Sequence, residues 1–216
     1  MERKTVVLTF DDAVSNHASF VAPLLVELGF HATFFLCEFP PDFAVNKRQY
    51  MTWEEIRSLD AAGFETANHT LTHAGLGEIG PAECEREIEA LEARFRDVGL
   101  PRSCSFAYPG GPAADYGPEL LARLGFRFGR KVEDRAWVPG VDDPFLVPAV
   151  AVHGADGSNF LRALSYGEQG GVPVLVYHGV PDSLHPWVDT PPETFVRQMR
   201  FLRREGYHVL AFRDFL

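Results

Sequence analysis

The sequence predicts an α/β fold, and more narrowly a distorted or incomplete parallel (β/α) barrel of about seven strands. Short apolar runs rich in β-branched and aromatic residues alternate along the chain with amphipathic helical patterns, which is typical of β/α units. No linker, repeat or low-complexity tract interrupts this alternation, so residues 1–216 are expected to form one domain. Each polar motif follows an apolar strand, and in such barrels the chemistry lies at the C-terminal ends of the strands.

The first half of the chain has clear signals for where helices and strands begin and end. The apolar strand at residues 6–10 is followed by a helical pattern that Gly29 is expected to cap at its C-terminal end. Thr52 and Glu55 have the spacing of a capping box, and Pro81 is expected to begin the longest helix. Further strands are expected at residues 32–37, 64–67 and 103–107.

The second half continues the alternation after one irregular stretch. A helix around Leu120 precedes a strand at residues 126–129. Three prolines break any periodicity between residues 132 and 152, so this region is expected to be irregular. The remaining elements are expected at 158–166 (helix), 172–177 (strand), 193–204 (helix) and 208–211 (strand).

Composition restricts the classes of partner. The formal net charge of −10 argues against nucleic acid, which is bound by clustered basic residues. Cys37, Cys84 and Cys104 form no C-x-x-C pair, so neither a disulfide framework nor a thiolate zinc site is indicated. The first strand begins near Thr5, leaving no room for a signal peptide, and no apolar run approaches the roughly 20 residues that span a membrane. We therefore expect a cytoplasmic protein with no nucleic-acid and no membrane partner.

Two adjacent carboxylates end the first strand. Side chains on a strand alternate between faces, so Asp11 and Asp12 can act at one site only if the backbone turns there. Such a turn would let one carboxylate bind a metal while the other handles protons. The alternative is an Asp pair that opens a loop and caps the helix beginning near Asn16.

Histidines follow two other strands. His69 and His73 are four residues apart, and on a helical turn they could present both imidazoles to one metal. With one aspartate they would form a set of two histidines and a carboxylate, which leaves a position for water. His178 directly follows the apolar strand at 172–177. The alternatives are a hydrogen-bonded core histidine for the pair and a surface histidine at a turn for His178.

Together these stretches resemble the polysaccharide deacetylase family, also called the NodB-homology family or carbohydrate esterase family 4. Residues 9–13 (Thr-Phe-Asp-Asp-Ala) resemble its T-F-D-D-G motif, and residues 69–73 (His-Thr-Leu-Thr-His) resemble its H-[ST]-x-x-H motif. Residues 175–178 (Leu-Val-Tyr-His) resemble its L-x-x-H motif, in the same order along the chain. The resemblance extends from about residue 5 to about residue 180.

The resemblance implies a metal-dependent hydrolase that removes acetyl from an N-acetylated sugar or polysaccharide, with residues 1–216 as its catalytic domain. It implies Asp12, His69 and His73 as ligands of a divalent metal, for which Zn²⁺ best suits the nitrogen and oxygen donors. It implies Asp11 as the general base and His178 as the general acid. The expected partner is a carbohydrate or a small amide substrate.

Several positions depart from the family pattern. Ala13 replaces a glycine, so the turn after Asp12 must tolerate a Cβ. Ala107 stands where the third motif commonly has the arginine that pairs with the base. Arg130, at the end of a later strand, is the candidate partner for Asp11, with a plain surface arginine as the alternative.

The rest of the third motif suggests where an oxyanion is stabilised. Tyr108, Pro109 and Gly110 are expected to line the oxyanion and substrate region, with Gly110 providing a backbone N–H because proline has none. Residues 134–137 (Asp-Arg-Ala-Trp) match the fourth motif, D-x-x-D-W, only faintly, so the sequence identifies no group that orients His178.

Other aromatic and imidazole residues are less specific signals. His17 is interpreted as a residue at the start of a helix rather than a substrate contact. Trp53 and Trp187 are interpreted as core or rim residues rather than sugar contacts. Two other functions stay open: hydrolysis of another non-peptide carbon–nitrogen bond, such as that of a cyclic amide, and a non-catalytic carbohydrate-binding protein.

Overall fold

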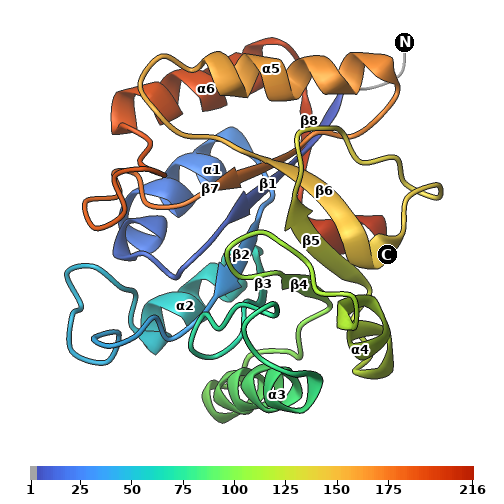
Figure 1. Ribbon diagram of the computed structural model, residues 1–216. Helices are drawn as coiled ribbons and strands as arrows, with labels where there is room; N and C mark the ends of the chain where they lie inside the picture. Colours follow the sequence, from blue (N-terminus) through green and yellow to red (C-terminus); the bar gives the residue numbers. More distant parts are fainter. Residues whose placement is uncertain (1–3) are drawn as a thin grey trace.

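The computed structural model describes residues 4–216, and a barrel of parallel strands forms its centre (Figure 1). The strands are β1 (Thr5–Phe10), β2 (Thr33–Leu36), β3 (Glu65–Asn68), β4 (Ser105–Ala107), β5 (Phe128–Val132), β6 (Val147–Ala151), β7 (Val174–Tyr177) and β8 (His208–Leu210). Strands β1 to β7 pair in chain order, and pairing of β1 with both β7 and β2 closes the ring. Strand β8 pairs only with the first half of β1. The predicted distorted (β/α) barrel is therefore confirmed.

Side-chain alternation along the strands decides which residues face the barrel interior. Val7 of β1 belongs to the interior cluster, whereas Leu8 and Phe10 belong to the cluster between the barrel and the helices. Residues two positions apart on a strand share a face. Asp11 lies four residues after interior Val7, and His69, Arg130 and His178 each lie two residues after an interior residue (Ala67, Phe128 and Val176). These four polar side chains therefore share the interior face of the strands.

Six helices surround the barrel (Figure 1): α1 (Ala22–Leu28), α2 (Trp53–Ala61), α3 (Pro81–Val98), α4 (Gly117–Arg123), α5 (Ser158–Tyr166) and α6 (Pro192–Arg204). The predicted caps are confirmed, since left-handed Gly29 ends α1 and a complete Thr52–Glu55 capping box begins α2. Pro81 is the first residue of α3, the longest helix. No helix between residues 4 and 216 combines the length and apolar character that a membrane crossing requires.

The stretch from residue 132 to residue 152 is more regular than predicted. It contains a 3₁₀ turn, Pro144–Leu146, followed directly by β6, which pairs with β5 and β7. Pro148 is only the second residue of β6, where a missing N–H removes little of the ladder. The prediction was wrong because pairing with β5 and β7 stabilises an apolar strand that contains one of these prolines.

The C-terminal segment fills the N-terminal end of the barrel. The Phe212 N–H donates to Thr33 Oγ1 at 3.0 Å, and the Arg213 N–H donates to the buried Glu65 carboxylate at 3.0 Å. The ring of Phe212 is fully buried. It packs against interior aromatic rings, namely Phe35, Phe128 and Trp137. The opposite end, where the strands finish, is the open one.

Candidate active site and metal centre

The chain turns sharply where β1 ends. The Asp11 N–H donates to Tyr177 O at 3.0 Å, which extends the pairing with β7, whereas the Asp12 N–H donates to Phe35 O in β2 at 3.1 Å. Asp12 has φ +73° and Ala13 has φ +52°, both in the left-handed region that L-residues rarely adopt. The backbone turn predicted at this point is present, and Ala13 occupies it despite its Cβ.

A second strained segment carries His69 and His73. These residues lie in a loop after β3 and not on a helical turn, so that detail of the prediction was wrong. Left-handed φ values at Thr70 (+59°) and His73 (+58°) fold the loop back on itself. Asn68 anchors it, because its Oδ1 accepts the Thr70 N–H at 2.9 Å while its Nδ2 donates to Glu92 of α3 at 2.8 Å. Within residues 4–216, positive φ outside glycine occurs only in these two segments, as expected where strain is held at a functional site.

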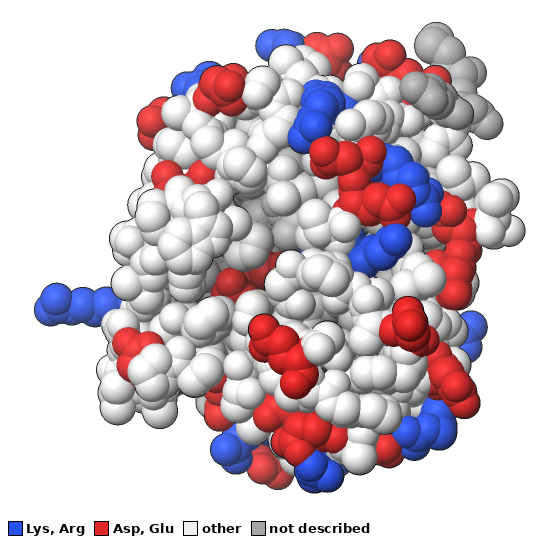
Figure 2. Space-filling view, viewed as in Figure 1, with Lys and Arg blue, Asp and Glu red and all other residues white. Residues whose placement is uncertain are grey.

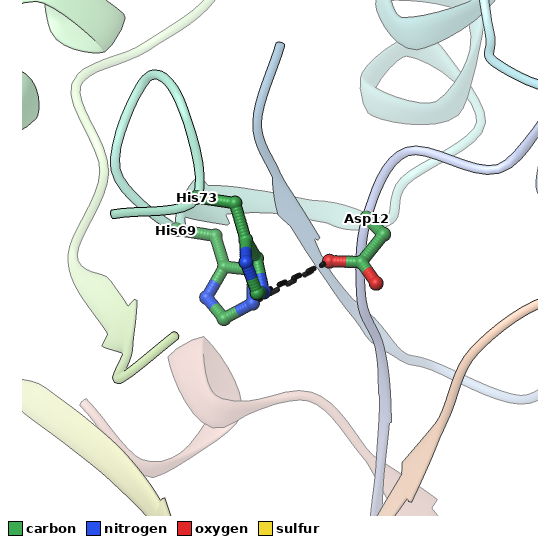
Figure 3. A group of neighbouring side chains, drawn as sticks. All are labelled: Asp12, His69 and His73. Atoms are coloured by element: carbon green, nitrogen blue, oxygen red, sulfur yellow. Dashed lines mark ion pairs between the residues drawn. The ribbon is translucent and has the colours of Figure 1, made fainter. Parts of the chain in front are cut away.

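The two turns bring Asp12, His69 and His73 together at the C-terminal ends of the strands (Figure 3). Asp12 Oδ1 lies 3.6 Å from His69 Nε2 and 3.5 Å from His73 Nε2. The three donor atoms lie within 4.8 Å of one another. His69 Nδ1 donates to Ala107 O at 2.8 Å, which fixes the tautomer and leaves the Nε2 lone pair facing Asp12.

The protonation of this group suits a cation. Burial lowers the pKa of His69 to about 3 and that of His73 to about 4, so both imidazoles are neutral and able to donate a lone pair at neutral pH. Burial and the neighbouring Asp11 charge raise the pKa of Asp12 well above its usual range. A positive ion between the three donors would relieve that cost. The residues present therefore fit a divalent metal.

Asp11 forms a buried ion pair with Arg130. Arg130 Nη2 donates to both carboxylate oxygens of Asp11 at 2.6 Å, and both side chains are almost fully buried. Burial alone would raise the pKa of Asp11, but the Arg130 guanidinium and the nearby imidazoles outweigh it and hold the pKa below its usual value. Ala107 of β4, which stands where the third motif commonly has an arginine, is the register partner of Arg130 in β5. The guanidinium therefore reaches Asp11 from the neighbouring strand.

His178 lies close to both carboxylates. Its Nε2 is 3.9 Å from Asp11 Oδ2 and 3.9 Å from Asp12 Oδ2. Burial lowers its pKa. No carboxylate elsewhere in residues 4–216 forms an ion pair with it. The faint fourth motif does not supply one, since its Asp134 pairs with Arg162 at 2.9 Å and its Trp137 packs on Phe215.

The residues expected at the oxyanion region separate into different environments. The Tyr108 N–H is used by Arg130 O at 3.0 Å, and its hydroxyl donates to Phe145 O at 2.9 Å, away from the pocket. Pro109 lines a neighbouring hollow that it shares with Gly110. Gly110 lines both that hollow and the pocket of Asp11. No acceptor within residues 4–216 takes the Gly110 N–H.

The pocket over these groups has a volume of about 330 Å³. Figure 2 shows it as a hollow with acidic side chains at its base and mostly uncharged surface on one side. Two residues of its wall, Phe39 and His185, were not singled out from the sequence. Phe39 packs on His73 with ring centroids 4.8 Å apart and on His185 at 5.2 Å. His185 in turn contacts Trp187, which is 68 % exposed. The one sequence signal that could have identified Phe39 as a pocket residue is its position shortly after the end of β2.

Two residues considered from the sequence lie outside the pocket lining. His17 is fully buried and begins a π-helical turn, His17–Val21, which agrees with a residue at a helix start. Trp53 donates its Nε1 hydrogen to Glu38 at 3.2 Å and packs on Phe95. Trp187, by contrast, is a rim residue of the pocket.

Comparison with known proteins identifies the family. The polysaccharide deacetylase family matches residues 1–129, more than half of the chain. A chitooligosaccharide deacetylase from Bradyrhizobium sp. (strain ANU 289) is 32 % identical over 148 residues, covering 64 % of this chain and 62 % of that protein. YxkH of Bacillus subtilis (strain 168) is 22 % identical over 133 residues, covering 62 % of this chain and 46 % of YxkH. The chain thus spans about half to two thirds of the length of these relatives.

The fold agrees with solved structures of this class. A family 4 carbohydrate esterase from Streptomyces lividans, solved in complex with acetate, superposes with a TM-score of 0.63 at 19 % identity. The match covers 95 % of this chain and 91 % of that one. The chain belongs to the polysaccharide deacetylase family, also known as the NodB-homology family or carbohydrate esterase family 4.

Proposed function

We propose that the protein is a metal-dependent deacetylase that hydrolyses the acetamido group of an N-acetylated sugar or polysaccharide. The observation that carries the proposal is the position of Asp11, whose Oδ2 lies 3.8 Å from His69 Nε2 and 3.9 Å from His178 Nε2. A carboxylate, a metal-binding set and an imidazole thus surround one pocket. The family match and the similarity to a chitooligosaccharide deacetylase support the choice of substrate class.

Asp12, His69 and His73 would hold the divalent ion, and nitrogen and oxygen donors in this number suit zinc. When bound, the ion supplies a Lewis acid for the acetyl carbonyl and a charge that favours deprotonation of water. The buried hydrogen bond from His69 to Ala107 keeps the ligand nitrogen free of a proton.

Asp11 and His178 would move the protons. Asp11 is ionised and cannot rotate freely because Arg130 holds both of its oxygens, so it can accept a proton from the attacking water. The water oxygen bonds to the carbonyl carbon, and the carbon–nitrogen bond then breaks. His178, whose Nε2 lies 3.9 Å from an oxygen of each carboxylate, donates a proton to the departing amine, giving acetate and a free amino sugar.

Gly110 would stabilise the negative charge that develops on the carbonyl oxygen. Gly110 lines the pocket, and its N–H is not used by another acceptor of residues 4–216, unlike the Tyr108 N–H. A fixed donor of this kind typically contributes about 10²–10³-fold to turnover. Tyr108 and Pro109 would act by fixing the backbone of Gly110. Residues 1–216 would together form a single catalytic domain.

Hydrolysis of a cyclic amide is the second candidate. The observation that favours it is the open space beside Gly110, where an added Cβ would meet no atom within 4 Å. A compact ring could occupy that space without a long groove. A non-catalytic carbohydrate-binding protein ranks last, because Asp11 and His178 both line the pocket.

A metal and product assay tests the proposal. Protein stripped with a chelator should release no acetate, and addition of zinc should restore acetate release from N-acetylglucosamine oligomers. His73→Ala should lose both bound zinc and activity, whereas His31→Ala, a control at an exposed histidine outside the site, should keep both. Ring-opened product from cyclic amides without acetate release would favour the second candidate. Zinc binding without turnover of either substrate class would favour the third.

A further inference from the structure

The segment that carries His178 is held through its backbone. His17 Nε2 donates to His178 O at 2.9 Å. Asn16, the preceding residue, accepts the Val180 N–H at its Oδ1 (2.9 Å) and donates from its Nδ2 to Pro181 O (2.8 Å). Two consecutive side chains therefore bind three residues of the loop after β7.

The bond from His17 is built into the core. A carbonyl oxygen only accepts, so Nε2 must carry the hydrogen and a neutral ring leaves Nδ1 bare. Nδ1 is buried and has no partner within residues 4–216. Burial lowers the pKa of His17 to about 4, which keeps the ring neutral. The ring packs against both Phe10 and Phe34, with centroids 5.5 and 5.6 Å away, so it has little freedom to rotate.

The local backbone explains how these side chains reach the loop. Asn16 is the N-cap of the π-helical turn His17–Val21, and such wider turns are rare and frequent at functional sites. The turn begins a few residues after Asp11 and Asp12. One short segment thus provides both carboxylates of the site and both side chains that bind the loop of His178.

We propose that His17 and Asn16 are positioning residues that hold the His178 imidazole in line with the leaving amine. The proposal rests on the proposed deacetylase function and adds to it the residues that set the geometry of the acid. The His178 ring has no carboxylate hydrogen bond within residues 4–216, so contacts to its backbone segment constrain it. The Asp182 carboxylate, which accepts the Gly179 N–H at 3.1 Å, adds to the contacts from Asn16 and His17. This clamp, defined as Asn16 and His17, acts where the faint fourth motif supplies no carboxylate to orient the ring.

The kinetic test compares variants of the clamp. His17→Phe keeps the ring and removes the donor, so kcat for an N-acetyl sugar should fall roughly 10- to 100-fold, as for a misplaced catalytic group. KM and the zinc content should not change. His17→Gln keeps a donor of similar reach and should recover most of the loss. Asn16 lies nearer the surface than His17, and Asn16→Ala should also lower kcat. This variant tests the proposal if His17→Phe does not fold.

A change of leaving group separates positioning from general damage. An aryl acetate releases a phenolate that needs no proton, so its hydrolysis does not depend on a general acid. The clamp variants should therefore keep near-normal activity on p-nitrophenyl acetate while losing activity on the sugar amide. Equal losses on both substrates would overturn the proposal.

Tyr177→Phe is the matched control. It removes one buried hydrogen bond, from Tyr177 Oη to Gln198 at 3.0 Å, next to His178 in the chain but directed at α6. It should lower the melting temperature as His17→Phe does and leave kcat unchanged. A crystal structure of His17→Phe gives a readout independent of activity, since the His178 ring should be displaced or disordered relative to His69. If wild-type protein releases no acetate, the proposed deacetylase function is wrong, whatever the position of His178. If the His178 ring is unmoved in His17→Phe, the positioning role of the clamp is wrong.

Discussion

At the scale of single residues, Ala13 shows how backbone strain is offset by burial of a methyl group and by the lower chain entropy of alanine in the unfolded state. Its φ of +52° costs about 1–2 kcal/mol for a residue with a Cβ. Ala13→Gly removes that strain but loses about 0.8 kcal/mol of methyl burial and adds about 0.5–1 kcal/mol of unfolded-chain entropy. The free energy of unfolding should therefore change by less than about 1 kcal/mol. Ala163→Gly, at a buried helical position without strain, should lose about 1.5–2 kcal/mol in the same urea titration.

Arg130 is expected to control the acidic limb of the pH profile. The depressed pKa of Asp11 stabilises the fold above the unfolded value of about 3.9, and this contribution is lost as pH falls through the lower folded pKa. Arg130→Gln removes the main charge that opposes burial and leaves only the nearby imidazoles to do so, so the pKa of Asp11 should rise and the acidic limb of kcat/KM should move to higher pH. Removing one partner of a buried pair should also cost about 3–5 kcal/mol of stability.

Two controls accompany that variant. Arg123→Gln breaks a surface pair with Glu85 and should leave the pH profile unchanged. Ala107→Arg in the Arg130→Gln background places a guanidinium on the neighbouring strand at the paired position and should move the limb back. An unchanged profile in Arg130→Gln itself would mean that Asp11 does not titrate in the rate-limiting step.

At the scale of elements, the C-terminal 3₁₀ turn Phe212–Phe215 should matter for stability and not for chemistry. Phe212→Ala empties a fully buried site among interior rings and should cost about 3–5 kcal/mol in urea unfolding. Phe201→Ala, at a partly buried position of α6, should cost less. At 25 °C the metal content and kcat of folded Phe212→Ala should match those of wild type, because the turn lies at the opposite end of the barrel from Asp11. A selective loss of zinc would contradict this view.

The sequence predicted elements well where local signals decide them. The capping box at Thr52, the glycine after α1 and the bounds of α5 are all local, and all three are confirmed. Strand β6 was missed because tertiary pairing with β5 and β7 overrides the proline that it contains.

The candidate site was predictable in its residues and not in its geometry. The first two motifs named Asp12, His69 and His73, and the structure brings these side chains together. The left-handed loop that joins the histidines could not be predicted, since hydrophobic periodicity carries no information on φ. The contact of Asn16 with the loop after β7 spans most of the chain and is likewise invisible to local patterns.

At the scale of the whole molecule, charge should select among substrates. The protein has a formal net charge of −10, and Arg130, the only Lys or Arg among the described residues lining the pocket, is paired with Asp11. Oligosaccharides with a carboxylate on every second sugar should therefore show a kcat/KM roughly tenfold lower than neutral ones at low ionic strength. Added salt should reduce the difference, since the Debye length is about 8 Å at physiological ionic strength. A salt-independent ratio would point to local contacts instead.

The closure of the barrel also fixes when the site can form during synthesis. Strand β1 pairs with β7 through Val7 and Val174, and most of the given sequence lies between these two residues. At a synthesis rate of about 5–20 residues per second, this apolar strand waits on the order of 10–30 seconds for β7, although its other neighbour, β2, is made sooner. Pairings this distant in sequence also form slowly. The nascent chain thus carries both aspartates long before His178 is made, and chaperones that cover apolar strands would act on this protein during that interval.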